Sequence, residues 1–172
     1  MIIESQKHLF DMPPGVAYFN NAYMSPLMHS VVAAMQEGVA AKAQPWTIKP
    51  DDFFLYTEET RSLAAQLFGS APDSIAIVPS ASYGIQTAAN ALPLTAGKTV
   101  LVLEDQFPSN IYPWQEKAKR VNAAVKILKT PEDGDWTSVL LEAIDADTAI
   151  AALPQTHWSS GAALDLPRIR AA

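Results

Sequence analysis

Three absences in the sequence restrict the kinds of protein that it can encode. Without cysteine among its 172 residues, the chain has no disulfide, thiolate metal site or cysteine nucleophile. Twelve Lys and Arg against eighteen Asp and Glu give a net charge of −6, with no basic stripe for nucleic acid or an anionic membrane. No apolar run approaches the ~18 residues that a membrane span requires. We therefore expect a small-molecule or protein partner and a cytoplasmic location.

The length and composition are typical of a folded domain. With 49% apolar residues, the chain can bury a sizeable core, in one domain or in two small ones. The first ten residues include Glu4, Lys7 and His8 where a signal peptide would need an apolar stretch. We therefore expect the mature chain to begin near Met1.

The first part of the chain, residues 1–70, is expected to form an extended segment followed by two helices. A Pro-Gly turn at 13–15 precedes a short extended piece. Ser25 and Pro26 then occupy the cap and first-turn positions of a helix, since apolar residues recur at three- and four-residue steps after them. A second helix is predicted over residues 51–68, ending at Gly69.

The second part, residues 71–172, alternates short apolar strands with single helices. This alternation is typical of βαβ units around a parallel sheet that is buried on both faces. We therefore predict an α/β fold with a mostly parallel sheet and flanking helices, and expect the chemistry in the loops after the strands. The predicted strands are residues 75–78, 99–103, 124–128 and 148–153, and the predicted helices between them are 82–91, 111–121 and 137–144.

The loop after the first predicted strand reads Val-Pro-Ser-Ala-Ser-Tyr-Gly, residues 78–84. At a strand-to-helix turn, backbone N–H groups and the hydroxyls of Ser80 and Ser82 suit a phosphate. Taken alone, the turn favours the simpler alternative that both serines only cap the helix. It contains neither G-x-G-x-x-G nor a P-loop, and the chain has no G-x-S-x-G elbow or H-E-x-x-H pair that would indicate a hydrolase.

Two further loops add aromatic residues at the same predicted sheet edge. Phe107, in Glu-Asp-Gln-Phe-Pro-Ser-Asn at 104–110, can stack on a flat heteroaromatic ligand; alternatively it is a core residue, as we expect for Trp114. The loop after the last strand contains His157 and Trp158. His157 by itself would be a surface histidine. Three such loops together favour a ligand site more than any one of them does.

The order of these blocks resembles the amino-terminal half of the class V aminotransferases, a family that includes cysteine desulfurases, kynureninases and isopenicillin-N-epimerase-like proteins. The resemblance covers about residues 18–168. It implies a three-layer, pyridoxal-phosphate-dependent transferase-like fold (fold type I), pyridoxal 5′-phosphate as the cofactor of the full-length member, an amino acid substrate and a homodimer. Its four blocks are Tyr-Phe-Asn-Asn-Ala at 18–22, Ser-Ala-Ser-Tyr-Gly at 80–84, residues 104–110 with Pro-Trp at 113–114, and Thr-His-Trp-Ser-Ser-Gly at 156–161.

The resemblance implies cofactor-binding roles for five residues. Ala81 and Ser82 match the family's phosphate-binding positions, and Phe107 matches the residue stacked on the pyridine ring. His157 and Trp158 lie in the block that contacts the cofactor. At the position of Trp158, desulfurases carry an asparagine that bonds the phenolic oxygen of the cofactor.

The resemblance also bears on the substrate. Asn20 and Asn21 match the amino-terminal strand that borders the substrate pocket. Phe107 and Trp158 differ from the residues that desulfurases have at these positions. The Phe-Pro-Ser sequence is closer to that of kynureninases and epimerase-like members. Kynureninase-like, epimerase-like and transaminase chemistry are not separable from these residues.

The family's aspartate on the pyridinium nitrogen and its cofactor-linked lysine both follow the block that ends at Gly161. No lysine of this chain has the family's context, so we assign no catalytic residue and expect no catalysis by these 172 residues alone. Asp165 and Pro167 begin a final helix, which favours an amino-terminal fragment with an incomplete sheet. The alternative is a non-catalytic module for phosphate-ligand binding or assembly. The lysines are Lys7, Lys42, Lys49, Lys98, Lys117, Lys119, Lys126 and Lys129.

Overall fold

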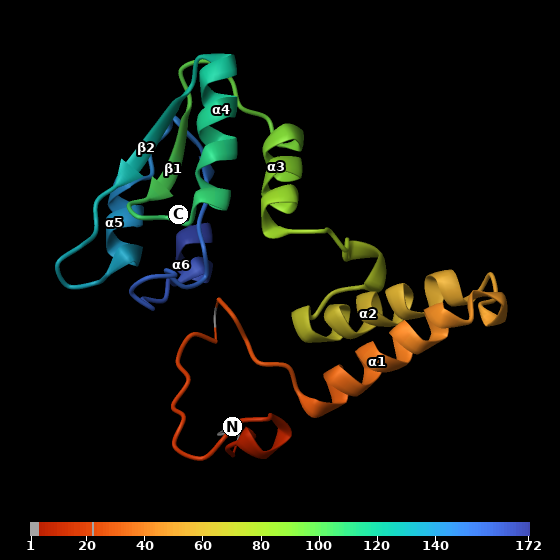
Figure 1. The fold of residues 1–172 in the computed structure, drawn as a ribbon. Coiled ribbons are helices and arrows are strands. Elements are labelled where there is room, and N and C mark those ends of the chain that lie inside the picture. Colours follow the sequence, from red (N-terminus) through yellow and green to blue (C-terminus); the bar gives the residue numbers. More distant parts are fainter. Residues whose placement is uncertain (1–3, 22) are drawn as a thin grey trace. The chain divides into compact units, whose positions relative to one another are not determined.

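The computed structural model describes residues 4–21 and 23–172 and divides into two compact units, Met1–Ile77 and Val78–Ala172 (Figure 1). Ala22, the last residue of the Tyr-Phe-Asn-Asn-Ala block, lies outside the described residues, as does Met1. Within the described ranges, no helix has both the length and the apolar character that crossing a membrane requires. Each unit is described by itself.

The first unit contains two long helices, α1 (His29–Ala43) and α2 (Asp52–Phe68). The prediction that Ser25 caps α1 is wrong. Met28 is the residue before the helix, and its extended backbone, held in a bridge to Phe10, delays the first helical turn to His29. As predicted, α2 ends at Gly69, whose positive φ of 64° suits a residue without a Cβ. Three short 3₁₀ turns complete this unit, η1 (Lys7–Leu9), η2 (Pro45–Thr47) and η3 (Pro72–Ser74).

The strand predicted at residues 75–78 does not form. Arg61 of α2 donates from Nε to the carbonyl of Ile75, at 3.1 Å, so that a side chain takes an acceptor that a strand would need. Ile77 and Val78 are 54% and 40% exposed, and no strand in the described part of the chain pairs with this segment. The segment is therefore a connection between the two units.

The second unit is a three-stranded parallel sheet with helices on both faces, as the alternating pattern predicted. Strand β1 (Thr99–Leu103) lies in the centre, between β2 (Ala124–Leu128) and β3 (Thr148–Ala151). The first two strands have the predicted bounds, whereas β3 ends two residues before the predicted 153. The helices are α3 (Ala81–Ala91), α4 (Tyr112–Val121), α5 (Trp136–Ala143) and α6 (Leu166–Arg170), with the 3₁₀ turn η4 (Pro108–Asn110) before α4.

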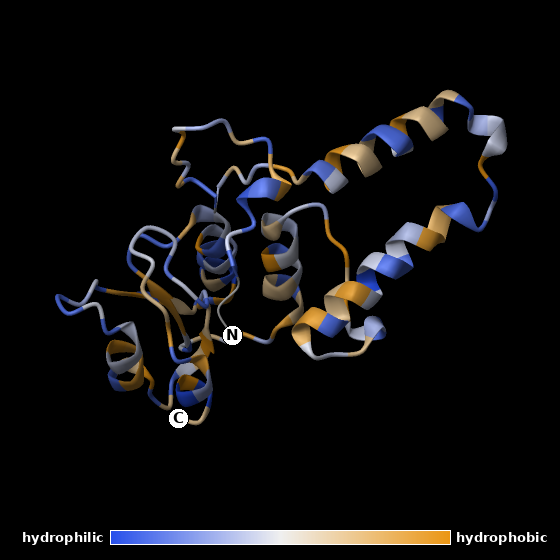
Figure 2. Ribbon diagram, turned by 90° about the horizontal axis from the view of Figure 1, so that it is seen from below, coloured by the Kyte–Doolittle hydropathy of each residue, from blue (hydrophilic) through white to orange (hydrophobic). Residues whose placement is uncertain are grey.

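Alternate side chains of β1 form two separate cores. Val100 and Val102 pack in one cluster with residues of α3 and α4, including Trp114, which is buried as predicted. Leu101 and Leu103 pack in another cluster with residues of α5 and α6. Because side chains alternate across a strand, one apolar strand builds both faces of a three-layer unit. Figure 1 shows the helices on either side of the sheet, and Figure 2 shows the strands as apolar segments.

Candidate functional site

The first turn of α3 presents free hydrogen-bond donors. Ser80 caps the helix, with its Oγ accepting from the N–H of Tyr83 at 3.1 Å. The N–H groups of Ala81 and Ser82 have no acceptor among the described residues, as is usual for the start of a helix. The Oγ of Ser82 lies 2.8 Å from the Oγ of Ser109 instead of capping the helix. Of the two serines, therefore, only Ser80 is a cap.

A cavity of about 530 Å³ lies against this turn. It is bordered by the first turn of α3 and by the segment that runs from η4 into α4. The amino-terminal end of a helix carries a partial positive charge, which favours an anion. No role is predicted for Ser109 from the sequence, although a hydroxyl residue in a loop after a strand is a signal that could have indicated one. The lining residues are Ser80, Ser82, Tyr83, Gln86, Pro108, Ser109, Tyr112 and Pro113.

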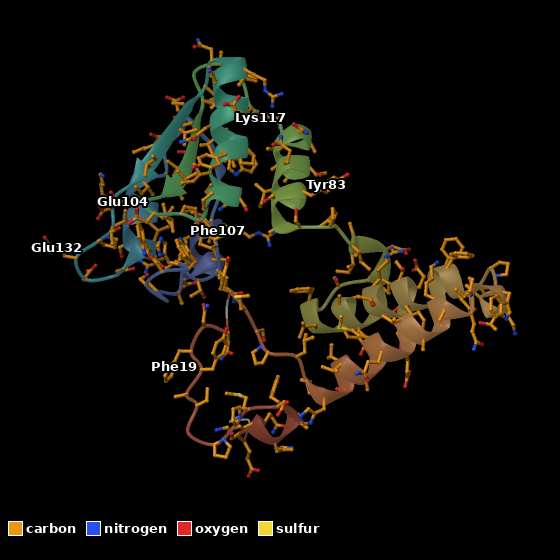
Figure 3. The ribbon with its side chains drawn as sticks, viewed as in Figure 1. Phe19, Tyr83, Glu104, Phe107, Lys117 and Glu132 are labelled. Carbon is orange, nitrogen blue, oxygen red and sulfur yellow. The ribbon has the colours of Figure 1, made fainter. Side chains whose placement is uncertain are left out.

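Two exposed aromatic rings lie beside each other at the carboxyl end of the sheet. The centroids of Phe107 and Trp158 are 5.4 Å apart, and the rings meet edge to face at 88°. Both side chains are partly exposed, at 42% and 59%, so Phe107 is not a core residue. The Nε1 of Trp158 donates to the carbonyl of Asp105 at 2.6 Å, which ties the loop after β3 to the loop after β1. Figure 3 shows Phe107 and Glu104 at this end of the sheet.

His157 is buried, so the expectation of a surface histidine is wrong. Its ring stacks on Trp136 of α5, with centroids 5.3 Å apart and planes at 19°. Its Nε2 lies 3.0 Å from the carbonyl oxygen of Glu104, and its Nδ1 lies 3.1 Å and 3.3 Å from the hydroxyls of Ser159 and Ser160. All of its nitrogens thus have protein partners. A direct contact with a cofactor stays a prediction.

Glu104 binds the loop after β1 to the chain that follows β2. Its Oε1 lies 2.5 Å from the Nζ of Lys129, and its Oε2 accepts from the N–H of Thr130 at 3.0 Å. The hydrogen bond from Lys129, followed by that from Thr130, lowers the pKa of Glu104 to about 2. Sequence spacing could not have indicated this pairing, since the two side chains belong to different strand ends.

Asn110 makes a comparable connection between η4 and the end of β3. Its Nδ2 donates to the carbonyl of Ala152 at 3.0 Å, and its Oδ1 accepts from Nε1 of Trp114 at 3.4 Å. The segment that carries Phe107 and Ser109 is therefore tied to the end of β3.

Asn20 and Asn21 belong to the first unit, and both are exposed. The carbonyl of Asn20 accepts from the N–H groups of Tyr23 and Met24, which closes a turn. The part of Asn20 and Asn21 in a substrate pocket stays a prediction.

The groups that the second unit brings together fit a phosphate ester with a planar ring. Ser109, which contacts Ser82, is only two residues beyond Phe107, so one short segment joins the phosphate donors to the ring platform. Free N–H groups and hydroxyls suit the phosphate, and exposed aromatic faces suit the ring. We use "phosphate cradle" for Ala81, Ser82 and Ser109, and "ring platform" for Phe107 and Trp158.

Comparisons with known proteins agree on one family. The family described as "Aminotransferase class-V" matches residues 17–172. A "Probable cysteine desulfurase" of Mycoplasma genitalium is 28% identical over 114 residues, which are 65% of this chain and 28% of that protein. An "Uncharacterized aminotransferase YcbU" of Bacillus subtilis is 28% identical over 114 residues, which are 66% of this chain and 30% of that protein.

Solved structures share the fold. The C-DES variant K223A, described with glycine covalently linked to its PLP cofactor, has a TM-score of 0.82 at 20% identity, over 97% of this chain and 45% of that one. The cysteine desulfurase CsdA of Escherichia coli has a TM-score of 0.68 at 21% identity, over 88% of this chain and 40% of that one. The predicted fold type I architecture is therefore confirmed. The chain spans less than half the length of each of these relatives.

Proposed function

The chain belongs to the aminotransferase class-V family, and from this premise we propose that its second unit supplies the phosphate cradle and the ring platform of a pyridoxal-phosphate enzyme that acts on an amino acid. One observation carries the proposal. The hydroxyls of Ser82 and Ser109 lie 2.8 Å apart, and Ser109 is two residues beyond Phe107. Phosphate donors and an aromatic ring thus come from one connected set of segments.

The cradle binds the cofactor's phosphate through two kinds of donor. The N–H groups of Ala81 and Ser82 point out of the first turn of α3, where the helix dipole adds a partial positive charge. The hydroxyls of Ser82 and Ser109 rotate to donate to phosphate oxygens in place of their mutual hydrogen bond. Neither kind of donor carries a full charge. The affinity of the cradle for phosphate therefore depends on several aligned dipoles.

The ring platform holds the cofactor's planar ring. Phe107 offers an exposed face, and Trp158 meets it edge to face, which limits the positions that the Phe107 ring can take. Apolar rings on one side of the ligand also exclude water from it. Bound pyridoxal phosphate supplies an electron sink for breaking bonds at the substrate's α-carbon.

We propose an amino acid as the substrate, with two groups of candidate reactions. The Phe-Pro-Ser sequence at 107–109 supports kynureninase-like or epimerase-like chemistry. The descriptions of the relatives support a second candidate, cleavage of a carbon–sulfur bond. They name a cysteine desulfurase, and a C-DES structure is described as a cystine C–S lyase with cysteine persulfide as its product.

We further propose that the 172-residue chain alone does not catalyse the reaction. Lys129, at the carboxyl end of the sheet, is paired with Glu104, and Lys117 is buried with its Nζ donating to the carbonyls of Ala89 and Leu92. Neither is a free amine beside the ring platform. We also propose a homodimer and a cytoplasmic location. Size-exclusion chromatography with light scattering would test the first, and cell fractionation would test the second.

The proposal is tested on the full-length protein that carries this segment. Reconstitution with pyridoxal phosphate is expected to produce a visible absorption band distinct from that of the free cofactor. Incubation with cysteine, cystine and kynurenine then separates carbon–sulfur cleavage from kynureninase-like chemistry, because sulfide or persulfide forms in the first case and anthranilate in the second. A protein that shows neither the band nor any product contradicts the proposal.

A further inference from the structure

We propose that His157 is a positioning residue that sets the orientation of the ring platform without contacting the ligand. The ligand-binding consequence rests on the proposed function, whereas the positioning itself rests on the hydrogen bonds of the second unit alone. Four observations support it: the parallel hydrogen bonds of His157 and Trp158, the burial of His157, the left-handed backbone of Asp105, and the contacts that hold Glu104.

Two consecutive residues bond two consecutive carbonyls. The Nε2 of His157 lies 3.0 Å from the carbonyl oxygen of Glu104, and the Nε1 of Trp158 donates to that of Asp105 at 2.6 Å. Because a carbonyl oxygen only accepts, Nε2 must carry the proton in the first bond. In the neutral ring, Nδ1 is then an acceptor for the nearby hydroxyls of Ser159 and Ser160.

The side chains of His157 and Trp158, which donate these two hydrogen bonds, differ in how deeply they are buried. His157 is 3% exposed and stacks on Trp136, which is 1% exposed and belongs to α5. Trp158, in contrast, is 59% exposed, so packing alone does not fix its ring. His157 is therefore the anchored member of the pair, and Trp158 takes its position from the adjacent anchor and from its single hydrogen bond.

The loop that receives both bonds has an unusual backbone. Asp105 has a φ of +51°, in the left-handed region that residues other than glycine rarely adopt. Its conformation must be maintained by its neighbours. Two groups of the preceding residue, Glu104, are held in place. Its carboxylate is held by Lys129 and Thr130, and its carbonyl is held by His157.

Phe107 lies two residues beyond Asp105 and meets Trp158 edge to face. Loss of the bond from His157 releases one side of the loop and loosens the position of Trp158 at the same time. Both members of the ring platform would then lose their mutual orientation, while Ala81 and Ser82, the cradle residues on α3, would be unaffected.

The test uses a matched pair of variants of the 172-residue chain. In H157Q the amide nitrogen can reach the position of Nε2 and donate to Glu104. In H157N the side chain is one carbon shorter and cannot reach it. We expect the indole N–H of Trp158 to exchange with D₂O on the order of tenfold faster in H157N than in the native chain, since one hydrogen bond is lost, and H157Q to retain slow exchange. The indole N–H of Trp114 serves as an internal control for the fold.

Ligand binding supplies a second readout. Pyridoxine 5′-phosphate, which lacks the aldehyde and cannot label lysines, is expected to bind H157N several-fold more weakly than H157Q, with inorganic phosphate binding equally to both. The positioning role is overturned if Trp158 exchanges equally in the two variants, or if Trp114 accelerates as much as Trp158. If the native chain binds neither ligand, the proposed function fails, and the exchange rates of Trp158 still decide the role of His157.

Discussion

The hydroxyl oxygens of Ser82 and Ser109 lie 2.8 Å apart, although the two residues are 27 positions apart in the sequence. Ser82 belongs to the first turn of α3, and Ser109 belongs to η4, just beyond Phe107. The contact therefore places the start of a helix next to the segment that carries an exposed aromatic ring. A ligand with a phosphate and a flat ring would use both.

Replacing Ser82 with alanine is expected to weaken the binding of phosphate ligands. The change removes a hydroxyl donor to a charged group, which corresponds to about a tenfold increase in Kd or more. Isothermal titration with pyridoxine 5′-phosphate measures it. S138A is the matched control, because Ser138 is a first-turn serine of α5 whose hydroxyl donates to Asp135. Equal affinities for S82A and S138A would remove Ser82 from the cradle.

Replacing Phe107 with alanine is expected to weaken the binding of the ring and to leave the binding of phosphate alone unchanged. Loss of an aromatic contact corresponds to an increase of roughly two- to tenfold in the Kd for pyridoxine 5′-phosphate. F53A provides the control, since Phe53 is a 68% exposed phenylalanine of α2 in the first unit. If F107A changed the affinities for both ligands by the same factor, Phe107 would have no specific part in binding the ring.

Replacing Ser80 with alanine is expected to lower the free energy of unfolding of the second unit by about 1 kcal/mol. Its Oγ is the cap acceptor for the N–H of Tyr83, and removal of such a cap typically has this cost. Urea unfolding followed by tryptophan fluorescence measures the loss. S80D restores an acceptor and should recover the stability, but its negative charge should weaken phosphate binding. An S80A chain as stable as the native one would contradict the assignment of the cap.

The carboxylate of Glu104 is expected to make stability depend on pH in the acid range. Its pKa is lowered to about 2 in the folded chain, below the value of about 4.3 for an unfolded glutamate. A lowered pKa means that the ionised form stabilises the fold. The contribution is therefore fully present above about pH 5 and is lost as the pH falls towards 2.

Unfolding of the native chain and of E104Q between pH 7 and pH 2 measures this contribution. The native chain is expected to be the more stable at neutral pH, and the difference should disappear near pH 2. E132Q controls for the loss of one negative charge, because Glu132 is exposed and forms no ion pair among the described residues (Figure 3). A difference that stays constant down to pH 2 would contradict the pairing with Lys129.

Local patterns were sufficient to predict most elements of the second unit. The bounds of β1 and β2 follow from two continuous apolar runs, and α3 begins one residue before its predicted start because Ser80 is the cap. The strand at 75–78 was predicted on the same grounds and is wrong. An apolar run indicates an extended segment, but pairing depends on distant partners, and here Arg61 takes the carbonyl of Ile75.

The arrangement of the site depends more on contacts between distant residues. The pattern of predicted strands could indicate that Phe107 and Trp158 share a sheet edge, since the carboxyl ends of parallel strands lie at the same edge. It could not indicate that His157 is buried, because its partners, Trp136 and the carbonyl of Glu104, lie 21 and 53 positions away. For the same reason the left-handed backbone of Asp105 had no signal in the sequence.

The central claim is that the second unit binds the phosphate and the ring of one ligand together. Amide and indole N–H chemical shifts of the 172-residue chain, recorded during titration with pyridoxine 5′-phosphate, pyridoxine and inorganic phosphate, test it most directly. We expect pyridoxine 5′-phosphate to bind more tightly than either fragment and to shift the amides of Ala81 and Ser82 together with the indole of Trp158. Binding no tighter than that of inorganic phosphate, or shifts that leave Ala81 and Ser82 unchanged, would contradict the account.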